Sequence, residues 1–367
     1  MELELQQIGM VVAALCVALI VALITTPVVK ILAQKMGAVD VPKDNRRMHD
    51  HPIPRMGGLA IFFGFMLSTL IFLPMNNQLR SMLLGSVIIV ILGIFDDIYS
   101  LKAPFKFVVQ IIAALVAVWG GNLIEAFSNP NIFSANLIWE LGWLKYPVTV
   151  IWIVAITNAV NFIDGLDGLA CGVSTISSMT LLVISLVVSD GPVALLMAAL
   201  AGGCIGFLPY NLNPAKIFMG DTGSTFLGFI LAVVSIQGLF KFYAIISFAV
   251  PFLMLGLPIF DTCFAFIRRI AHGQSPMHAD RSHVHHRLID MGFSQKQAVA
   301  VLYVISAILG LSAVVLTTVG ALKAMLLLLA LCAAGAVAGI LFIGNNEKKN
   351  GGDHGVPASS DDMEEKK

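Results

Sequence analysis

Charged residues are scarce in this chain of 367 residues, since Asp, Glu, Lys and Arg together make up only 12% of it. An ordinary soluble domain carries about 25% charged residues, so the shortage excludes that class. The mean hydropathy is +0.89. Apolar runs of about 18 residues or more recur, the length that a helix needs to cross the bilayer core. A membrane β-barrel would instead show alternating segments of roughly ten residues. The sequence therefore predicts an all-α polytopic membrane protein.

Positive charge is missing ahead of the first apolar run, which covers about residues 8–32. Glu2 and Glu4 precede that run, and Lys30 and Lys35 lie at its end. A cleavable signal carries its positive charge before the apolar stretch. The first run is therefore predicted to be an uncleaved span with its N-terminus outside. The five cysteines form no CxxC pair, so we interpret them as small packing residues rather than as disulfides or metal ligands.

The apolar runs predict about 11 transmembrane helices. They lie at about residues 8–32, 56–73, 80–95, 105–121, 145–162, 168–189, 193–211, 222–239, 243–267, 297–318 and 321–343. Of the 22 Lys and Arg residues, only Arg80, Lys145, Lys241 and Lys323 then fall outside. The positive-inside rule thus places the C-terminus in the cytoplasm. We expect an integral membrane domain over residues 1–344 and a disordered cytoplasmic tail over 345–367, which is polar and charged.

Five aspartates lie at the ends of apolar runs, each in a short motif with Gly or Asn. They are Asp96 and Asp97 in GIFDDIYS, Asp164 and Asp167 in NAVNFIDGLDGLA, and Asp221 in FMGDTGSTFLG. Ionisable groups near membrane depth are costly and usually line a polar site. The predicted topology brings all five to the cytoplasmic face. Adjacent carboxylates repel unless a cation holds both ionised, and Mg²⁺ binds carboxylates together with substrate phosphate oxygens. The pattern favours an enzyme that handles a cation and an anionic substrate there.

Each acid also has an alternative interpretation. A single Asp at a helix end is often a cap. Asp221 follows Gly220 and begins a span, so it could cap the helix, bind a metal, or lie where the helix N-terminus attracts phosphate. Asp164 and Asp167 are three apart and share a face if their segment is helical. The intervening glycines could instead open that helix end to a ligand.

A late loop, SPMHADRSHVHHRLIDMG, carries His283, His285 and His286 close to Arg281 and Arg287. Zinc is disfavoured because no cysteine is nearby and adjacent histidines cannot share the i, i+4 face of an HExxH site. Anion binding is favoured, because both side-chain types donate to phosphate oxygens. A basic loop attracted to anionic lipid is the alternative.

Other charged positions stay open at this stage. Lys106, at the start of a span, could be a snorkelling lysine. The first inner loop, VDVPKDNRRMHDHPIPRMGGLAIF, is weak evidence alone, because juxtamembrane Lys and Arg are expected on that side. Asp261 lies deeper, within a span, as either a paired structural acid or part of the site.

In combination and order, these motifs resemble the polyprenyl-phosphate N-acetylhexosamine-1-phosphate transferases (glycosyltransferase family 4). The resemblance rests on the paired DD, NAVNFIDGLDGLA, KIFMGDTGS and the late HxHH loop, and covers about residues 20–300. The branch resembles the undecaprenyl-phosphate GlcNAc-1-phosphate transferases that begin wall teichoic acid or O-antigen-type polymers. The first inner loop and LGLPIFDTCFAFIRRI look most like the teichoic-acid type from Gram-positive bacteria. The related phospho-MurNAc-pentapeptide transferases typically carry three consecutive histidines, whereas Val284 interrupts them here.

The resemblance implies Mg²⁺-dependent transfer of GlcNAc-1-phosphate from UDP-GlcNAc to undecaprenyl phosphate, with release of UMP, at a bacterial plasma membrane. Asp221 would bind Mg²⁺ (Mn²⁺ as the alternative) with Asp97. Asp96 and Asp97 would face the lipid phosphate, one of them as a base. Asp164 and Asp167 would lie near the nucleotide. The nucleotide pocket would be lined by Asn158, Asn161, Asn211 and Phe218. The phosphate groups of the substrates would be contacted by Lys106, Arg281, His283, His285 and His286.

A rival from another class is an ion-coupled secondary transporter, whose acids usually lie near the bilayer midplane at broken helices of related repeats. Here the five acids lie at one face and no internal repeat is evident. A non-catalytic scaffold would leave the acids unexplained. The partners expected are the two substrates, the bilayer and a second copy in a homodimer; no nucleic acid is expected.

Overall fold

The computed structural model describes residues 2–42, 51–128, 138–239, 249–271, 273, 283–319 and 323–330. Most of these residues are helical. The helices are α1 (Glu2–Lys35), α2 (Gly58–Phe72), α3 (Asn77–Tyr99), α4 (Ala103–Trp119), α5 (Lys145–Phe162), α6 (Leu169–Val187), α7 (Gly191–Asn211), α8 (Gly220–Leu239), α9 (Ala249–Met254), α10 (Gly256–Ala271), α11 (Val284–Asp290) and α12 (Gln295–Val319), with the 3₁₀ turn η1 (Gly142–Leu144). The short strands are β1 (Val39–Asp40), β2 (Ile53–Pro54), β3 (Ala126–Ser128) and β4 (Ile138–Glu140), paired antiparallel as β1–β2 and β3–β4.

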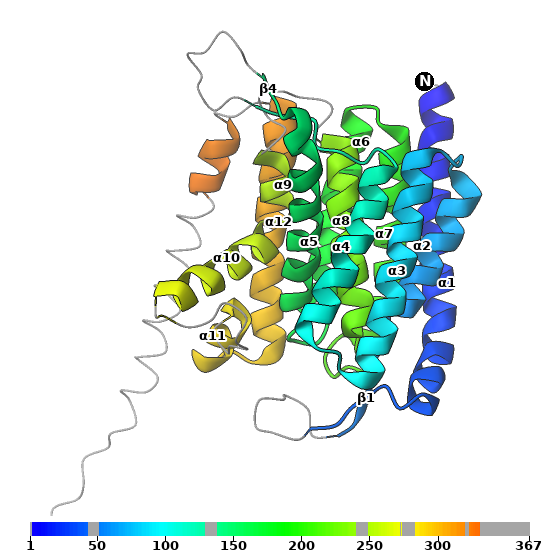
Figure 1. Ribbon diagram of the computed structural model, residues 1–367, viewed down its shortest axis with the longest axis vertical. Coiled ribbons are helices and arrows are strands. Elements are labelled where there is room, and N and C mark those ends of the chain that lie inside the picture. Colours follow the sequence, from blue (N-terminus) through cyan, green and yellow to red (C-terminus); the bar gives the residue numbers. More distant parts are fainter. Residues whose placement is uncertain are drawn as a thin grey trace, which may run out of the picture.

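Six described helices are long and apolar enough to cross a membrane: α1, α3, α5 with η1, α6, α7 and α12. The prediction of an all-α polytopic membrane protein is confirmed. Shorter apolar helices, α2 and α4, stand among them (Figure 1). Of the last expected span, 321–343, residues 323–330 are helical, and the remainder lies outside the described residues, as does the expected tail.

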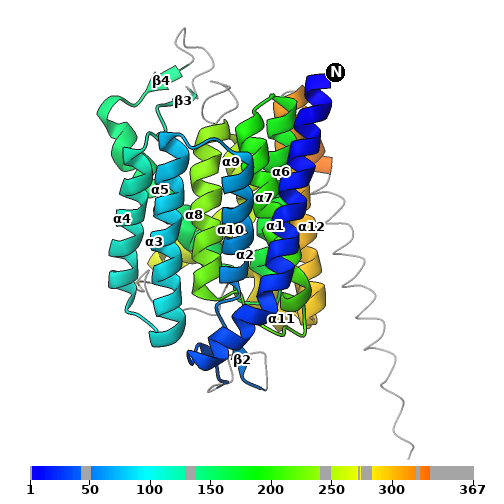
Figure 2. The same ribbon diagram turned by 90° about the vertical axis from the view of Figure 1, so that its right-hand side faces the viewer.

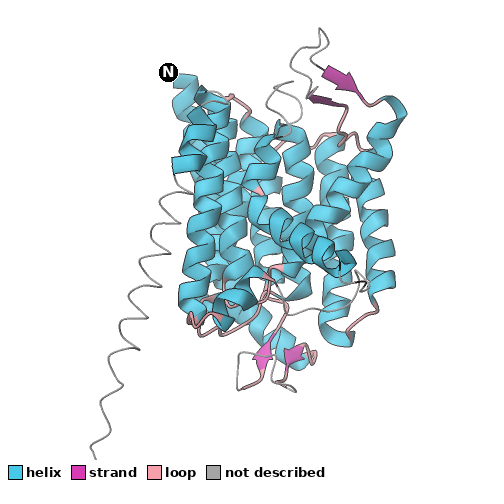
Figure 3. Ribbon diagram, turned by 90° about the vertical axis from the view of Figure 1, so that its left-hand side faces the viewer, coloured by secondary structure: helices cyan, strands magenta, loops and turns pink. Residues whose placement is uncertain are grey.

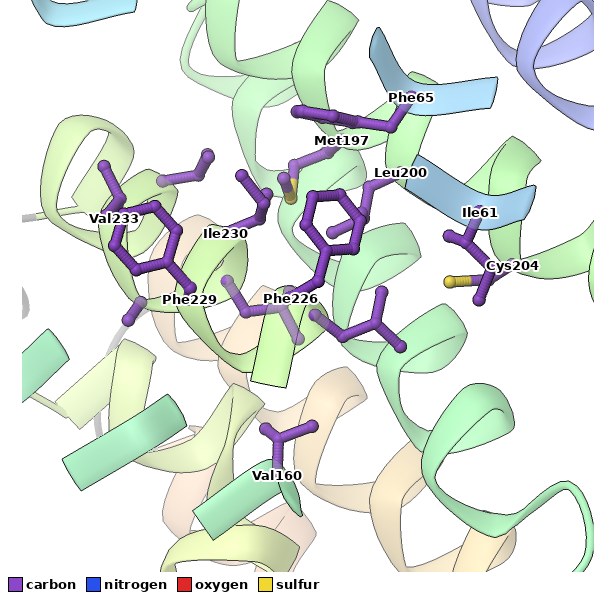
Figure 4. Packing of buried hydrophobic residues seen from close by; sticks show 14 of the residues in the cluster. Ile61, Phe65, Val160, Met197, Leu200, Cys204, Phe226, Phe229, Ile230 and Val233 are labelled. Carbon is purple, nitrogen blue, oxygen red and sulfur yellow. The ribbon is translucent and has the colours of Figure 1, made fainter. Parts of the chain in front are cut away.

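Helix α8 is the core of the bundle and packs against α2, α3, α5, α6 and α7. Its side chains are apolar nearly all round, the pattern of a helix surrounded by protein. Phe226 makes edge-to-face contacts with Phe62 and Phe65 of α2, at ring-centroid distances of 5.5 and 5.6 Å. It belongs to one hydrophobic cluster with Met197 and Leu200 of α7 (Figure 4). Outside this core, α1 lies along α2 and α7 (Figure 2).

The first turn of α8 packs closely against the backbones of α2 and α3. A Cβ atom added at Gly58 would lie 1.9 Å from Cα of Gly223, and one at Gly93 would lie 2.4 Å from Cα of Thr222. No side chain fits at those distances, so glycine is required at both positions. This close approach places the start of α8 directly beside the end of α3, and so brings Asp221 to Asp97.

One end of the bundle gathers the connections that carry the polar motifs. The β1–β2 hairpin, the α3–α4 turn, the α5–α6 and α7–α8 loops and α11 all lie there, opposite the N-terminus (Figure 1). The five aspartates of the sequence motifs lie on these connections or in the helix turns that adjoin them. The expectation that they share one end of the bundle is met.

The span expected at 243–267, which Pro251 and Pro258 interrupt, is not one continuous helix. In its place stand two helices, α9 and α10, and α10 crosses the bundle obliquely (Figure 3); residues 241–248 lie outside the described part. The break follows from Pro258, which has no N–H to donate to the carbonyl of Met254 four residues earlier. Ser177 of α6 donates to that carbonyl instead, at 2.9 Å. A neighbouring helix thus satisfies the freed backbone group, as a membrane interior requires.

Replacing Ser177 by Ala is therefore expected to lower the melting temperature in detergent, because the carbonyl of Met254 loses the donor that Ser177 supplies. The loss should be about 1 kcal/mol. Ser178→Ala is the matched control, since the Ser178 hydroxyl donates within its own helix, to the carbonyl of Ser174. Equal melting temperatures for the two variants would contradict this role of Ser177.

Candidate active site

Two of the aspartates share one cation. The ammonium of Lys106 lies 2.7 Å from Oδ2 of Asp96 and 3.2 Å from Oδ2 of Asp221. Asp96 comes from the last turn of α3, Lys106 from the first turn of α4, and Asp221 from the first turn of α8. The backbone N–H of Leu101 donates to the other oxygen of Asp96. A positive charge between two carboxylates offsets part of their repulsion. Lys106 is thus part of the site rather than a snorkelling residue.

Asp221 keeps a partly open position. Its Oδ1 accepts a hydrogen bond of 3.0 Å from Nδ2 of Asn161 on α5, which also contacts Oγ of Ser224 at 2.7 Å. The Asp221 side chain is 22% exposed and that of Lys106 is 29% exposed, whereas that of Asp96 is 4% exposed. The open edge of the cluster therefore belongs to Asp221 and Lys106, where a solute can reach them.

Asp97 lies inside the protein, with a fully buried side chain. It accepts hydrogen bonds from the N–H groups of Asp221 and Thr222, at 3.0 and 3.1 Å, and from the Thr222 hydroxyl at 2.7 Å. Free N–H groups at a helix start need such acceptors, and a carboxylate also suits the positive end of the helix dipole. Asp97 was expected to hold a metal or to face the lipid phosphate. Here both of its oxygens instead fasten α8 to α3.

Arg55 is a site residue that the sequence analysis did not single out. Its Nε lies 3.3 Å from Oδ1 of Asp97. Burial lowers the pKa of Arg55, but Asp97 and Asp221 outweigh that effect and raise it, so the side chain is a permanent cation. The segment is held in place by backbone hydrogen bonds from Gly57 to Phe218 and from Phe218 to Pro54. The first inner loop is thereby joined to the segment that leads into α8.

The two acids of the DGLDG motif do different things. The segment between α5 and α6 is a turn, with φ of +77° at Gly168, so of the two alternatives the shared helical face is excluded. Asp167 accepts from Nδ2 of Asn213 and N–H of Ala215, at 2.9 and 3.0 Å, and so secures the α7–α8 loop. Asp164 is half-buried. Burial, followed by the nearby charge of Asp221, raises its pKa to about 8.

This raised pKa predicts a stability effect of definite sign. The folded protein binds the Asp164 proton more tightly than the unfolded chain does, so from about pH 4 to pH 8 stability falls as pH rises. The Asp164→Asn variant lacks this group. Its melting temperature should exceed that of the unmodified protein by an amount that grows over this range and is constant above it. Ser178→Ala removes no titratable group and supplies the control, since its difference in melting temperature should be the same at every pH. A difference for Asp164→Asn that is the same at every pH would contradict the assignment.

Of the four residues expected to line the nucleotide, only Asn161 joins the acid cluster. Asn158 donates to Oε1 of Gln110 at 2.6 Å and to a carbonyl of its own helix, so it ties α5 to α4. Asn211 is buried and donates to the carbonyl of Ile217 at 3.1 Å. Phe218 is half-buried beside the site, in the segment paired with Pro54. Asn158 and Asn211 therefore hold helices and loops in this structure.

The histidine motif is organised by Asp261. Asp261 of α10 contacts Nδ1 of His283 at 2.8 Å and accepts from the N–H of Val284 at 2.8 Å. It is thus paired with His283 and caps α11 from a neighbouring helix. His285 stacks on His283 with ring centroids 5.7 Å apart, and its ring lies 4.3 Å from that of His286.

His285 does not have the exposure expected of a phosphate ligand. It is 2% exposed, and its Nε2 lies against Gly165, where an added Cβ would be 2.2 Å away. Burial lowers the pKa of His285 to about 3, so the ring is neutral near pH 7. It packs α11 onto the DGLDG turn. Arg281, also expected at phosphates, lies outside the described residues.

Fold and site together define a class: a polytopic membrane protein with an acid-lined, cation-bridged site at one end of its bundle. Within the described ranges, no group of three or more His, Cys, Asp or Glu side chains is arranged to hold a metal ion. Asp96 and Asp221 form a carboxylate pair joined by the ammonium of Lys106.

Comparison with known proteins identifies the family. The model of glycosyl transferase family 4 matches residues 79–239. A Bacillus subtilis protein named "Probable undecaprenyl-phosphate N-acetylglucosaminyl 1-phosphate transferase" is 47% identical, over 83% of this chain and 85% of its own length. The decaprenyl-phosphate N-acetylglucosaminephosphotransferase of Mycolicibacterium smegmatis is 34% identical, over 78% and 77%. The phospho-N-acetylmuramoyl-pentapeptide-transferase of Caldicellulosiruptor bescii is 33% identical, over 62% and 72%. The chain belongs to glycosyl transferase family 4 and is a multi-pass membrane enzyme.

Proposed function

We propose that this enzyme transfers GlcNAc-1-phosphate from UDP-GlcNAc to undecaprenyl phosphate and releases UMP. The names of its relatives support the substrates. The observation that carries the proposal is the pair of carboxylates, Asp96 and Asp221, that share the ammonium of Lys106 at one end of a membrane bundle. Such a site can bind positive charge beside two anionic reactants. That charge offsets the repulsion between the reactants.

The orientation of the bundle suits these substrates. With about 11 spans and the N-terminus outside, most Lys and Arg residues and all five site aspartates face the cytoplasm, in keeping with the positive-inside rule. A lipid phosphate would then meet the site at the inner surface of the bilayer, and a nucleotide sugar would reach it from the cytosol.

We assign Mg²⁺, or Mn²⁺ in its place, to Asp221 together with Asp96. The donor set fits, because Mg²⁺ commonly takes one or two carboxylates and completes its shell with substrate phosphates and water. Asp97 does not fit this task, since its side chain is fully buried and accepts three hydrogen bonds from the start of α8, whereas Asp96 shares the cation Lys106 with the partly exposed Asp221. When bound, the ion would neutralise charge on the pyrophosphate and its leaving group. Lys106 occupies the shared position here and would serve as a second cation.

The reaction can be written as one displacement. An oxygen of undecaprenyl phosphate attacks the phosphorus that carries GlcNAc, and the P–O bond to the uridylyl phosphate breaks. UMP leaves with that electron pair. Asp96 is the candidate base if the lipid phosphate arrives protonated. We prefer this step to a phospho-aspartate intermediate, because a positioned phosphate already supplies a nucleophile. Detection of a phosphorylated Asp after UDP-GlcNAc alone would overturn that preference.

The test is UMP release by the purified protein in detergent with undecaprenyl phosphate and one of two donors. UDP-GlcNAc should support divalent-cation-dependent release, and UDP-MurNAc-pentapeptide should not. Release with the second donor alone would favour the phospho-MurNAc-pentapeptide transferases, to which the chain is also similar. No release with any UDP-sugar would overturn the proposed function.

We further propose that the lipid-linked product starts a cell-envelope polymer, wall teichoic acid in the first instance. The support is the likeness of the first inner loop and of LGLPIFDTCFAFIRRI to the teichoic-acid type. Depletion of the protein in its own host should then lower the phosphate content of the wall, and an unchanged wall would contradict this assignment. A homodimer is proposed as well, and cross-linking in native membranes would test it.

A further inference from the structure

Arg55 enters the site on a backbone that is fixed on both sides. Its N–H donates to the carbonyl of Ala38, and the N–H of Gly57 donates to the carbonyl of Phe218, each at 2.9 Å. The residue between, Met56, is 1% exposed and has φ of +80°, a left-handed conformation that is strained for a side chain of this kind. Strained backbone persists where surrounding contacts enforce it and is concentrated at ligand sites. The fold thus holds Arg55 in one place against a local penalty.

The guanidinium of Arg55 is only partly used by the protein. Its Nε faces Asp97, while 30% of the side chain is exposed. Within the residues that the structure describes, Asp97 is its one ion-pair partner and is contacted through Nε, so no described carboxylate engages the two terminal nitrogens. Those two nitrogens form the planar fork that binds phosphate oxygens in pairs.

Neutralising Asp97 does not by itself account for an arginine here. Asp97 already accepts three hydrogen bonds from the start of α8, and the contact from Arg55 is the longest of its contacts, at 3.3 Å. A lysine could supply the charge equally well. What arginine adds is a rigid fork whose far edge stays open while Nε is anchored.

The open fork also lies where an anion needs support. Asp96 and Asp97 are consecutive in α3, one paired with Lys106 and the other with Arg55. Arg55 and Lys106, which come from different segments, therefore contact neighbouring residues of α3. A phosphate approaching the acidic cluster would meet a positive group from each, and such preorganised charge is most effective where water is partly excluded.

We propose that Arg55 is a substrate-binding residue whose terminal guanidinium nitrogens bind phosphate oxygens of a reactant. The ligand is a phosphate group, supplied either by the pyrophosphate of the nucleotide sugar or by the prenyl phosphate. This inference rests on the proposed function, because it takes both substrates from it.

The experiment compares Arg55→Lys and Arg55→Gln with the unmodified protein, with Lys102→Gln as the control. Lys102 is an exposed cation at the same end of the bundle and caps α4 without a side-chain hydrogen bond. Binding of UDP and of undecaprenyl phosphate is measured separately, as the rise in melting temperature with ligand concentration. For one of the two ligands, both Arg55 variants should weaken binding by about 10- to 100-fold, the size typical of a charge-assisted hydrogen bond. Lys102→Gln should change neither.

Each outcome has a definite meaning. Weaker binding of UDP alone assigns Arg55 to the donor, and weaker binding of the lipid alone assigns it to the acceptor. Unchanged binding of both by Arg55→Lys, with a lower melting temperature without ligand, would show that Arg55 only balances Asp97 and would overturn the inference. Binding is read without turnover, so failure of the unmodified protein to release UMP would contradict the proposed function separately.

Discussion

The Asp221→Asn variant is expected to release UMP at least ~10³-fold more slowly than the unmodified protein, while keeping its fold. Asn preserves the size of the side chain and the oxygen that accepts from Asn161. It removes the charge that Lys106 contacts at 3.2 Å and that we propose holds Mg²⁺. Groups that stabilise charge on a transferring phosphoryl group contribute several kcal/mol, and each 1.36 kcal/mol is tenfold in rate. Initial rates at saturating substrates provide the measurement.

Asp290→Asn is the matched control, because Asp290 is an exposed acid on α11 at the same end of the bundle. It should turn over at the unmodified rate. Melting temperatures of both variants establish that they are folded. A rate for Asp221→Asn within tenfold of the unmodified rate would remove Asp221 from the reaction and with it the proposed cation site.

The fold was predictable where one apolar run corresponds to one helix. The exact ends of the helices were harder to predict. The run at 80–95 gave no sign that α3 continues to Tyr99, which places Asp96 and Asp97 within its last turn instead of after it. The helix stops at Ser100, which has φ of +51°. Pro251 and Pro258 interrupt the run at 243–267, but the sequence does not show where the helix breaks or which neighbour donates to the freed carbonyl.

The sequence was enough to predict which acids lie together in the candidate site. It was not enough to predict the role of each acid. Topology alone brings the five acids to one end. Consecutive residues of an α-helix point about 100° apart, so Asp96 and Asp97 must face different partners, yet which of them turns inward depends on the contact with α8. Arg55 was missed for a similar reason. An arginine beside a membrane span is ordinary, and its value appears only when the first inner loop pairs with Phe218, far away in sequence.

Replacing Asp97 by Asn separates a positioning role from a metal-binding role. Asn offers one acceptor where Asp97 offers two, so its amide group would face an N–H donor of Asp221 or Thr222, both within 3.1 Å of the present carboxylate. A buried donor left unsatisfied costs about 1–3 kcal/mol. The start of α8 should shift, and a misplacement of about 1 Å at a reacting group can lower a rate by ~10²-fold. We expect a lower melting temperature together with a fall in kcat of that order.

Thr222→Val is a smaller perturbation of the same contacts. It removes only the hydroxyl donor at 2.7 Å and leaves both backbone donors to Asp97 in place. Its losses in melting temperature and kcat should be smaller than those of Asp97→Asn and in the same ratio. A metal ligand would behave differently: Asp97→Asn would then raise the Mg²⁺ concentration needed for half-maximal rate and leave the melting temperature without metal unchanged. That pattern would show that Asp97 binds the metal ion. Parallel losses in the two variants would instead mean that the carboxylate acts through α8, by holding Asp221 where the substrates meet.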